Sequence, residues 1–559
     1  MATQPISPIS KIHVEADREV SWLPMVIIAM AQILMVFNVS SLQVSIEGIV
    51  SSFNAPATAV GTAIVTYSLV VAGFIMLGAR IGQIFGSRLV FRSMILLFGA
   101  AMALMAFSPN AATMIVAQAL AGVAAAALVP TLVVLIADNY RGLQQEKALG
   151  WLGGAQAMGI VLGFLIAGTL STLIGWRYTY GLLVLLALGI YVLSNKLNPI
   201  KSRSNVSIDK VGVVLAAAAV FLISFGANNL TDWGLLLAGS RAPFSVLDMS
   251  PAPIMIVCGI FLVQAFFVWS RHRHASGQTP LISLEIVGTP QERAALFSIF
   301  TIGALSSAIT FLIPLYIQVV QGRSGLQTAV AVIPFSLASF GAAVLVVRLY
   351  DRLSPRHIAR YAFLIFSAGV LLLGTVIRND WSTFMVIVSM FVAGLGEGIL
   401  LTLLFNVLVT ASPKELAGDV GSLRGTTNNL AAGVGTALAG ALVVGLLATS
   451  VHRELVHNPT IPNELKMELN LDRVPFISNG QLREILASTT ATPEQVSEAA
   501  RINTEARLLA LKVSIFALAG LALLAFFPAG GLPEYVRGEV PRSKAGTALK
   551  KIQSDEKSH

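Results

Sequence analysis

Long apolar runs separated by short polar clusters repeat along almost the whole chain. A helix needs about 20 apolar residues to cross the hydrocarbon of a bilayer, and fourteen runs approach or exceed that length. Such runs predict an all-α membrane protein with about 14 transmembrane helices. We place them at 23–46, 58–79, 90–108, 111–137, 148–172, 178–196, 210–228, 252–270, 294–320, 325–347, 358–378, 382–411, 416–449 and 507–528.

The basic residues of the loops predict the orientation of these helices. An even number of helices puts both termini on one side of the membrane. If that side is the cytoplasm, the short inner loops hold 17 Arg and Lys residues and the short outer loops hold four, Arg177, Arg241, Arg323 and Arg378. Short cytoplasmic loops carry an excess of Lys and Arg. We therefore expect a multi-pass protein of the cell inner (plasma) membrane with both termini cytoplasmic.

Composition agrees with the lipid bilayer as the main surrounding. Hydrophobic residues make up 55% of the 559 residues and charged residues 12%, against about 25% charged in soluble domains. The net charge of +9 is dispersed among apolar helices, so we expect no nucleic-acid partner. The acidic start of the chain predicts no removable signal peptide.

A loop motif occurs once in each half of the chain. Residues 79–88 read ARIGQIFGSR and residues 347–356 read VRLYDRLSPR. Each lies between the second and third helix of a six-helix set. The pair resembles the G-x-L-x-D-R-x-G-R-K loop of the major facilitator superfamily. The resemblance implies two six-helix bundles that rock about a cavity at the membrane midplane.

Further motifs resemble the fourteen-helix drug:proton antiporter branch of that superfamily. Residues 159–168 read GIVLGFLIAG, similar to the antiporter motif, and Gly175-Trp176-Arg177 follows. The resemblance implies bundles at 23–200 and 276–530, joined by two linking helices within 201–275. Cytoplasmic tails are expected at 1–22 and 531–559. An external hairpin is expected at 451–506, either as a plain folded hairpin or as a lid that recognises ligand.

Several ionisable positions of that branch are neutral in this chain. Asn38 stands where the first helix usually carries aspartate, and the fourth helix has Gln118 and Gly122 without the usual arginine. Gln83 replaces the loop aspartate, and Phe164 replaces the proline of the antiporter motif. If the protein couples transport to protons, another group must carry them.

Glu397, in the run Gly394-Leu-Gly-Glu-Gly398, is the strongest candidate for that group. It lies near the middle of its expected helix, where a charged residue costs roughly 2.5–3.5 kcal/mol on insertion scales and is usually functional. A carboxyl group held away from water there is suited to bind and release a proton. The alternative is a structural ion pair, in which Arg424 reaches Glu397 or Asp419. Asp419 and Arg424 are therefore further candidates for proton coupling.

The resemblance implies that the first, fourth, ninth and twelfth helices line the cavity. Their neutral polar side chains suit amphiphilic or weakly polar substrates better than dications, although each alone could instead bond a neighbouring helix. These candidates are Asn38, Ser41, Gln43, Gln118, Thr301, Ser306, Thr310 and Asn406.

The loop motifs and the antiporter motif supply candidates for gating. By the resemblance, charged loop residues hold the inner side closed, and the glycines belong to the antiporter motif; the alternative for the cations is simple anchoring of the topology. The candidates are Gly86, Arg88, Gly159, Gly163, Gly168, Asp351, Arg352 and Arg356. With Gln83 in place of an acid, we expect the latch of the first half to be weak.

Other classes of function lack the residues they need. There is no nucleotide-binding G-x-x-x-x-G-K-[ST] run, no catalytic Ser-His-Asp or Cys-His grouping and no convincing metal site, so we expect no cofactor and no enzyme. The sequence favours a monomeric secondary transporter that exports small molecules in exchange for protons. The alternatives are an uncoupled facilitator or importer of a small polar solute, and a membrane sensor that does not transport.

Overall fold

The computed structural model describes residues 21–53, 57–197, 208–234, 237–239, 242–317, 321, 323, 325–350, 352–378, 383–412, 416–457, 482–483, 486 and 492–534. In this part of the chain fourteen helices are long and apolar enough to cross a bilayer, which confirms the expected fold class. The tails and the middle of the external hairpin lie largely outside the described residues.

The first bundle consists of six long helices and one short outer helix. A chain in hydrocarbon must satisfy its own backbone hydrogen bonds, which helices do within a single segment. Polar caps and prolines mark several of the helix starts: the Asn110 side chain accepts a hydrogen bond from the Thr113 amide at the start of one helix. The elements are α1 (Leu23–Val44), α2 (Ile46–Phe53), α3 (Ala57–Phe85), α4 (Ser87–Ala106), α5 (Ala111–Asn139), α6 (Gly142–Leu173) and α7 (Trp176–Leu193), followed by η1 (Ser194–Lys196).

The rest of the chain forms a helix pair and a second bundle. The pair is α8 (Lys210–Trp233) and α9 (Pro251–Ala275), followed by η2 (Leu284–Val287). The second bundle has α10 (Pro290–Leu315), α11 (Gly325–Leu345), η4 (Val346–Leu349), α12 (Pro355–Val376), α13 (Thr383–Ala411), α14 (Ala417–His457), α17 (Pro493–Leu524) and η7 (Pro528–Gly531).

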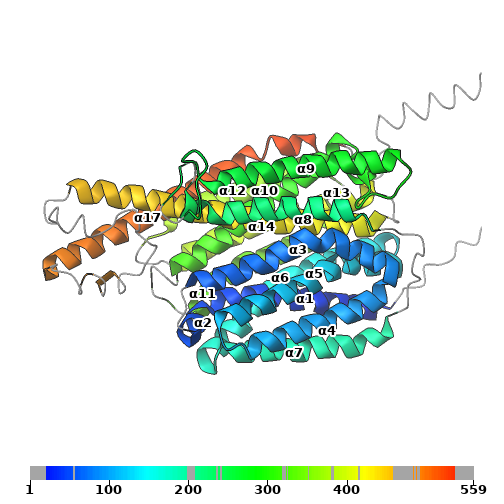
Figure 1. Cartoon of the computed structure of the whole chain (residues 1–559), viewed down its shortest axis with the longest axis horizontal. Helices are drawn as coiled ribbons and strands as arrows, with labels where there is room; N and C mark the ends of the chain where they lie inside the picture. The colour runs from blue at the N-terminus through cyan, green and yellow to red at the C-terminus, as the bar shows by residue number, and fades with distance from the viewer. Residues whose placement is uncertain are drawn as a thin grey trace, which may run out of the picture.

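The two bundles lie side by side with their helices roughly parallel to one axis. Figure 1 shows α1 to α7 in the lower part of the view and α9, α10, α12 and α17 in the upper part. The bundles meet where α6 packs on α11 and where α14 packs on α3 and α5, and α8 packs on both α3 and α14. We call the end where α1 begins and α17 ends the inner end. Its placement in the cytoplasm is the prediction from loop charge.

Two helices project beyond the other helices at the opposite, outer end. α14 and α17 are 41 and 32 residues long, and they project to the left in Figure 1. The stretch from Pro493 that the sequence predicted as helix-like is the first part of α17. A small apolar core holds the projecting parts together and includes Leu447, Val451, Ile502 and Ala506. The outer hairpin is therefore helical and packed in its described parts; a role as a lid stays a prediction.

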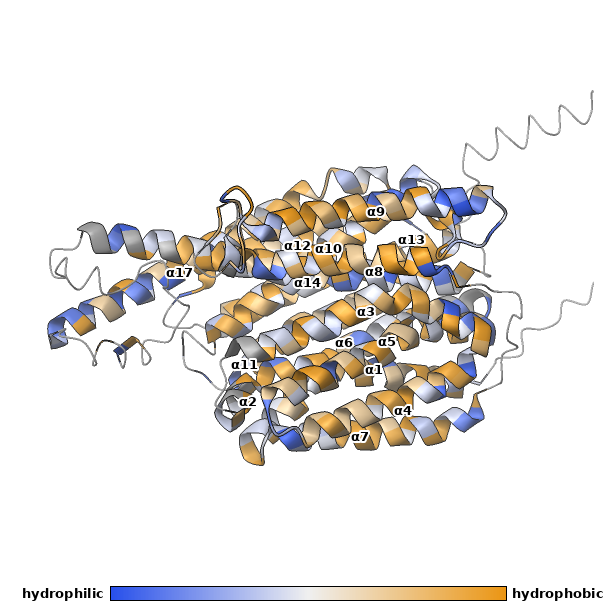
Figure 2. Ribbon diagram, in the orientation of Figure 1, coloured by the Kyte–Doolittle hydropathy of each residue, from blue (hydrophilic) through white to orange (hydrophobic). Residues whose placement is uncertain are grey.

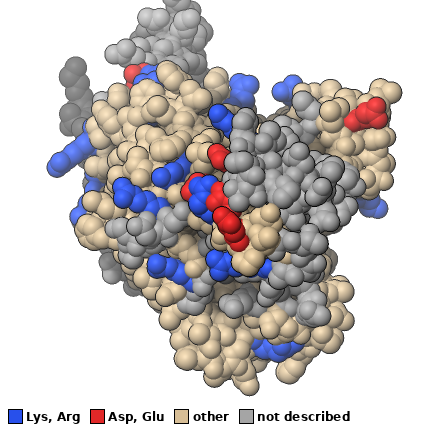
Figure 3. Space-filling model, turned by 90° about the vertical axis from the view of Figure 1, so that its left-hand side faces the viewer, with Lys and Arg blue, Asp and Glu red and all other residues tan. Residues whose placement is uncertain are grey.

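Apolar and hydrophilic residues are distributed over the molecule as expected for a protein that spans a bilayer. Figure 2 shows apolar residues along the helix bodies and hydrophilic residues at the helix ends and on the projecting hairpin. Figure 3 looks onto the outer end, where acidic and basic side chains lie close together. On the hairpin Arg501 forms ion pairs with Glu498 and Glu505 at 2.7 and 2.9 Å. Exposed pairs of this kind contribute little to stability.

Glycines of the antiporter motif let α6 lie directly against α1. A Cβ atom on Gly163 would lie 2.6 Å from the Ser40 Cβ atom and 3.3 Å from the Phe37 Cα atom, and one on Gly159 would lie 3.0 Å from the Val36 Cβ atom. Gly168 is also buried in α6. The motif therefore sets how closely the two helices approach.

We predict that Gly163→Ala destabilises the protein by about 1–3 kcal/mol, because the added methyl group overpacks the contact between α1 and α6. The measurement is the thermal unfolding temperature of the purified protein in detergent. Gly181→Ala in α7 is the matched control, since nothing lies within 4 Å of its Cβ position. Equal unfolding temperatures for the two variants would contradict the packing role of Gly163.

Candidate functional site

A cavity lies between the two bundles, in the inner half of their interface. Its walls come from α6 on one side and from α11, α13 and α14 on the other. The space open to water in it is about 60 Å³, which is room for a few water molecules and too little for a drug-sized ligand. The polar residues facing it include Gln156, Ser336, Ser339, Glu397, Asn406 and Arg424. We call this space the central cavity.

Glu397 faces the central cavity from the middle of α13, fourteen residues from either end of the helix. Ser306 of α10 donates a hydrogen bond to its Oε1 atom, and Ser339 of α11 also donates to the carboxyl group. Neutral hydroxyl groups therefore hold this carboxyl group. Among the residues that the structure describes, no cation is paired with it.

The glycines beside Glu397 bring neighbouring backbones up against α13. A Cβ atom on Gly394 would collide with the Phe335 carbonyl group, and one on Gly398 with the Ser339 carbonyl group. On the other side, a Cβ atom on Gly396 would lie 2.6 Å from the Phe366 backbone nitrogen atom. The run Gly394 to Gly398 thus fixes Glu397 at a point where α11 and α12 cross α13 closely.

Arg424 faces the same cavity from α14 but does not pair with either carboxylate that the sequence suggested. Its guanidinium carbon lies 4.1 Å from the centre of the Phe405 ring. Its Nη2 atom lies 3.5 Å from the Gln156 Oε1 atom on α6, the limit for a hydrogen bond. The ion pair of Arg424 with Glu397 or Asp419, which the sequence left open as an alternative, is absent among the described contacts, and Asp419 has another basic partner.

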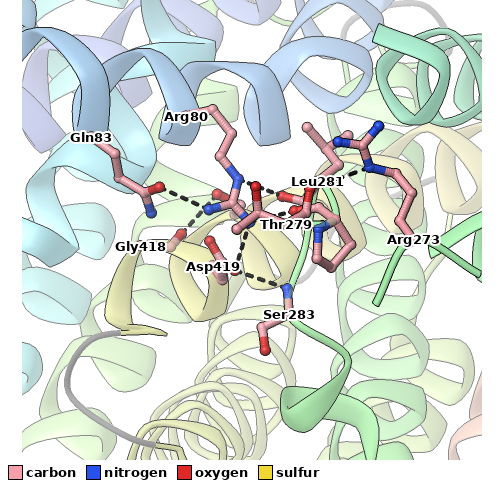
Figure 4. Close-up of polar contacts among 10 residues, drawn as sticks. Arg80, Gln83, Arg273, Thr279, Leu281, Ser283, Gly418 and Asp419 are labelled. Atoms are coloured by element: carbon pink, nitrogen blue, oxygen red, sulfur yellow. Dashed lines mark hydrogen bonds and ion pairs between the residues drawn. The ribbon is translucent and has the colours of Figure 1, made fainter. Parts of the chain in front are cut away.

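That partner is Arg80 of α3, and together they form what we call the inner latch. The Arg80 Nη2 atom lies 3.2 Å from the Asp419 Oδ2 atom, and the two side chains are 10% and 2% exposed. Figure 4 shows the surrounding contacts: Arg80 also donates to the Leu281 carbonyl oxygen at 2.9 Å and to the Gln83 Oε1 atom at 2.8 Å. The Ser283 amide donates to Asp419 at 2.9 Å. The latch ties both bundles to the loop that follows α9.

The inner latch involves two residues of the first loop motif. Gln83, which stands where the motif has an acid, accepts a hydrogen bond from Arg80, while Asp419 supplies the negative charge; a weak latch in the first half stays a prediction. The pairing of Arg80 with Asp419 was not predicted from the sequence. A usable signal was present, since Arg80 in the last turns of α3 and Asp419 at the start of α14 lie at the same end of the bundles.

Asn38 and Gln118 form a closed pair of amides inside the first bundle. The Asn38 Nδ2 atom donates to the Gln118 Oε1 atom at 2.9 Å, and the Gln118 Nε2 atom donates back to the Asn38 Oδ1 atom at 3.1 Å. Both side chains are fully buried. They join α1 to α5 and do not line the central cavity, so a contact with substrate stays a prediction.

The other predicted cavity residues are spread over several places. Asn406 lines the central cavity, and Ser306 reaches it through its bond to Glu397. Ser41, Thr301 and Thr310 donate to carbonyl groups of their own helices, and Gln43 is half-buried near the end of α1. The structure thus brings Asn406, Glu397 and Arg424 together.

The gating residues predicted from the two loop motifs lie at helix ends, while the glycines of the antiporter motif lie within α6. Gly86 begins α4 with a φ of 89°, a backbone conformation that favours glycine. Arg88 donates to the Asn195 carbonyl oxygen at 2.7 Å, and Arg356 pairs with Glu534 at 2.9 Å. Arg352 is exposed, and Asp351 lies outside the described residues. These contacts stay within one bundle and its flanking chain, unlike the inner latch.

Comparison with known proteins agrees with this architecture. Residues 28–436 match the family model of the Major Facilitator Superfamily. The chain is 28% identical over 343 residues to a lincomycin resistance protein of Streptomyces lincolnensis, which covers 61% of this chain and 67% of that protein. It is 27% identical over 450 residues to the puromycin resistance protein pur8 of Streptomyces alboniger, which covers 77% and 81%.

A solved structure supports the fold. The structure of an auto-inhibited peptide transporter of the POT family superposes with a TM-score of 0.55 over 93% of this chain and 98% of that one, at 14% sequence identity. The fourteen spans also fit the fourteen-helix branch that the sequence motifs resemble. The chain therefore belongs to the major facilitator superfamily, and it is a membrane transporter and not an enzyme.

Proposed function

We propose that this transporter exports amphiphilic, drug-like small molecules in exchange for protons, by alternating access. The observation that carries the proposal is the setting of Glu397. It is a carboxyl group at mid-membrane depth, it faces a cavity between the two bundles, and its partners are hydroxyl groups. An intramembrane acid with such partners is favoured for reversible protonation.

The walls of the central cavity support the substrate class. Apolar side chains such as Leu149, Ile160 and Leu401 alternate there with a few polar groups, an arrangement typical of small-molecule sites. The similarity to two antibiotic resistance proteins favours export of compounds of this kind. In this proposal the protein is a monomer in the inner membrane of the cell, with both termini in the cytoplasm.

The inner latch supports alternating access. Arg80 and Asp419 come from different bundles, and they lie at the inner end of the interface. Rocking of the bundles that opens the central cavity inward must break this buried pair. Loss of a partner from a buried ion pair typically costs about 3–5 kcal/mol, so the pair favours the arrangement that is closed at the inner end.

We predict that Glu397→Gln abolishes substrate-driven proton release, because a side-chain amide group, unlike a carboxyl group, does not bind and release a proton near neutral pH. Inside-out vesicles with an acidified lumen and a quenched pH dye are mixed with lipophilic compounds, and dequenching is recorded. Glu494→Gln, which neutralises an exposed acid on the outer hairpin, is the matched control and keeps wild-type dequenching. Transport of labelled compound without dequenching, equal in wild type and Glu397→Gln, would establish an uncoupled facilitator instead.

We predict that Asp419→Asn raises the rate at which the central cavity opens to the inner side by about tenfold or more, since a loss of only 1.4 kcal/mol already gives that factor. The rate is followed as alkylation of Thr402→Cys, a cavity residue, by an impermeant maleimide in inside-out vesicles. The background carries Cys258→Ser, which removes the one native cysteine.

Glu534→Gln is the matched control for the latch. It breaks the ion pair of Arg356, which also lies at the inner end but does not join the two bundles. We expect its alkylation rate to equal that of the background. An unchanged rate in Asp419→Asn would show that the latch does not hold the inner side closed.

A further inference from the structure

The central cavity holds two groups of opposite charge that do not neutralise each other. Glu397 and Arg424 both face it, yet no ion pair joins them in the described part of the chain. Buried charges usually pair, because each is costly to remove from water alone. Here each group is held by neutral partners instead, so the two remain separately available to a ligand.

Arg424 has donors to spare for an anionic group. A guanidinium group carries five N–H donors in a flat fork that matches a carboxylate or phosphate. One of them reaches the Gln156 Oε1 atom, at 3.5 Å, while the Phe405 ring lies against the face of the group at 4.1 Å. The ring fixes the plane of the fork without using its donors. The geometry suits capture of an acidic group at the boundary between α6 and α14.

Glu397 is matched to a basic group at a second position in the cavity. The hydroxyl groups of Ser306 and Ser339 hold its carboxyl group in place. They bring no positive charge of their own, so an ammonium group of a ligand meets no competing cation at this carboxylate. Tyr350 is the third ionisable side chain among the described residues that line the cavity.

We propose that the preferred substrates are zwitterions, amphiphiles that carry a basic amine and an acidic group. The amine replaces the proton on Glu397 while the acidic group binds Arg424. The proposal rests on the proposed function, because it assigns the proton to Glu397. Charge balances: the zwitterion enters with no net charge, and one proton leaves as the ammonium group pairs with the carboxylate.

Binding of such a molecule also gives a reason for the bundles to move. The present space of about 60 Å³ admits only a few water molecules, so α6 must separate from α13 and α14 before an amphiphile enters. Arg424 already touches Gln156 across that boundary. An acidic group that takes over the donors of Arg424 removes this contact between the bundles.

The test compares three forms of one fluorescent probe in inside-out vesicles with an acidified lumen. Nε-dansyl-lysine is zwitterionic, its carboxamide is cationic, and its Nα-acetyl derivative is anionic. A second series, in which a naphthoyl group replaces the dansyl group in all three forms, shows whether the result depends on how the dansyl group fits the cavity. In the wild type we expect uptake of the zwitterion to exceed that of the carboxamide by about 10- to 100-fold, the range for a charge-assisted hydrogen bond.

Variants of Arg424 then assign the preference. Arg424→Gln is expected to abolish the preference, so that the ratio of zwitterion uptake to carboxamide uptake falls by about 10- to 100-fold. Its unfolding temperature in detergent, compared with that of the wild type, shows that the variant is folded. Arg424→Lys keeps the charge without the flat fork and is expected to keep part of the preference.

Three results would overturn the inference: equal uptake of zwitterion and carboxamide by the wild type, preferred uptake of the anionic form, or an equal loss of both probes in Arg424→Gln. The proposed function fails separately, if no compound, whatever its charge, drives proton release that depends on Glu397. If the carboxamide drives as much Glu397-dependent proton release as the zwitterion does, the inference is contradicted and the proposed function is retained.

Discussion

Burial of charge in a low-dielectric interior is the constraint on which the rest of this structure depends. A charged group inside the membrane is costly unless it is paired or functional. The protein meets this cost in two ways at its bundle interface. At the inner end Arg80 and Asp419 pair directly, and backbone groups of the loop after α9 bond to both side chains. At mid-depth Glu397 and Arg424 rely on hydroxyl, amide and aromatic partners.

The contrast between the two sites explains how one interface serves both closure and transport. Glycines of α14 bring it against the first bundle: a Cβ atom on Gly421 would lie 2.9 Å from the Val133 side chain, and one on Gly425 would collide with Ile75. Close packing strengthens the direct pair of Arg80 and Asp419 and holds the inner end shut. One step deeper, the same interface widens into the central cavity, where a ligand or a proton can compete for the unpaired charges.

The sequence predicted the spans well because hydropathy is a local property. All fourteen runs correspond to helices, and the main differences are at α14 and α17, where polar residues continue the helices beyond the predicted apolar runs. The cavity was harder to predict, since its lining depends on how each helix is turned about its axis. α13 is apolar almost all round, so few of its residues, chiefly Glu397 and Asn406, marked the side that faces the cavity.

The neutral polar residues were also difficult to assign to the cavity from the sequence. Asn38 and Gln118 lie on helices that the family resemblance placed at the cavity, yet they bond each other inside the first bundle. Asn406 does line the central cavity. A single sequence does not distinguish an amide that faces a cavity from one that joins two helices, because both are isolated polar residues in an apolar run. Pairing of Arg80 with Asp419 across 339 positions likewise needs the tertiary arrangement.

The central claim is that Glu397 gives up its proton as substrate binds in the central cavity. Infrared difference spectroscopy of the reconstituted protein, with and without a transported compound, tests this directly. The account predicts that substrate removes a carbonyl stretching band of a protonated carboxyl group and adds carboxylate bands, and that both changes vanish in Glu397→Gln. Bands that persist in that variant, or substrate binding without any carboxyl band change, would contradict it.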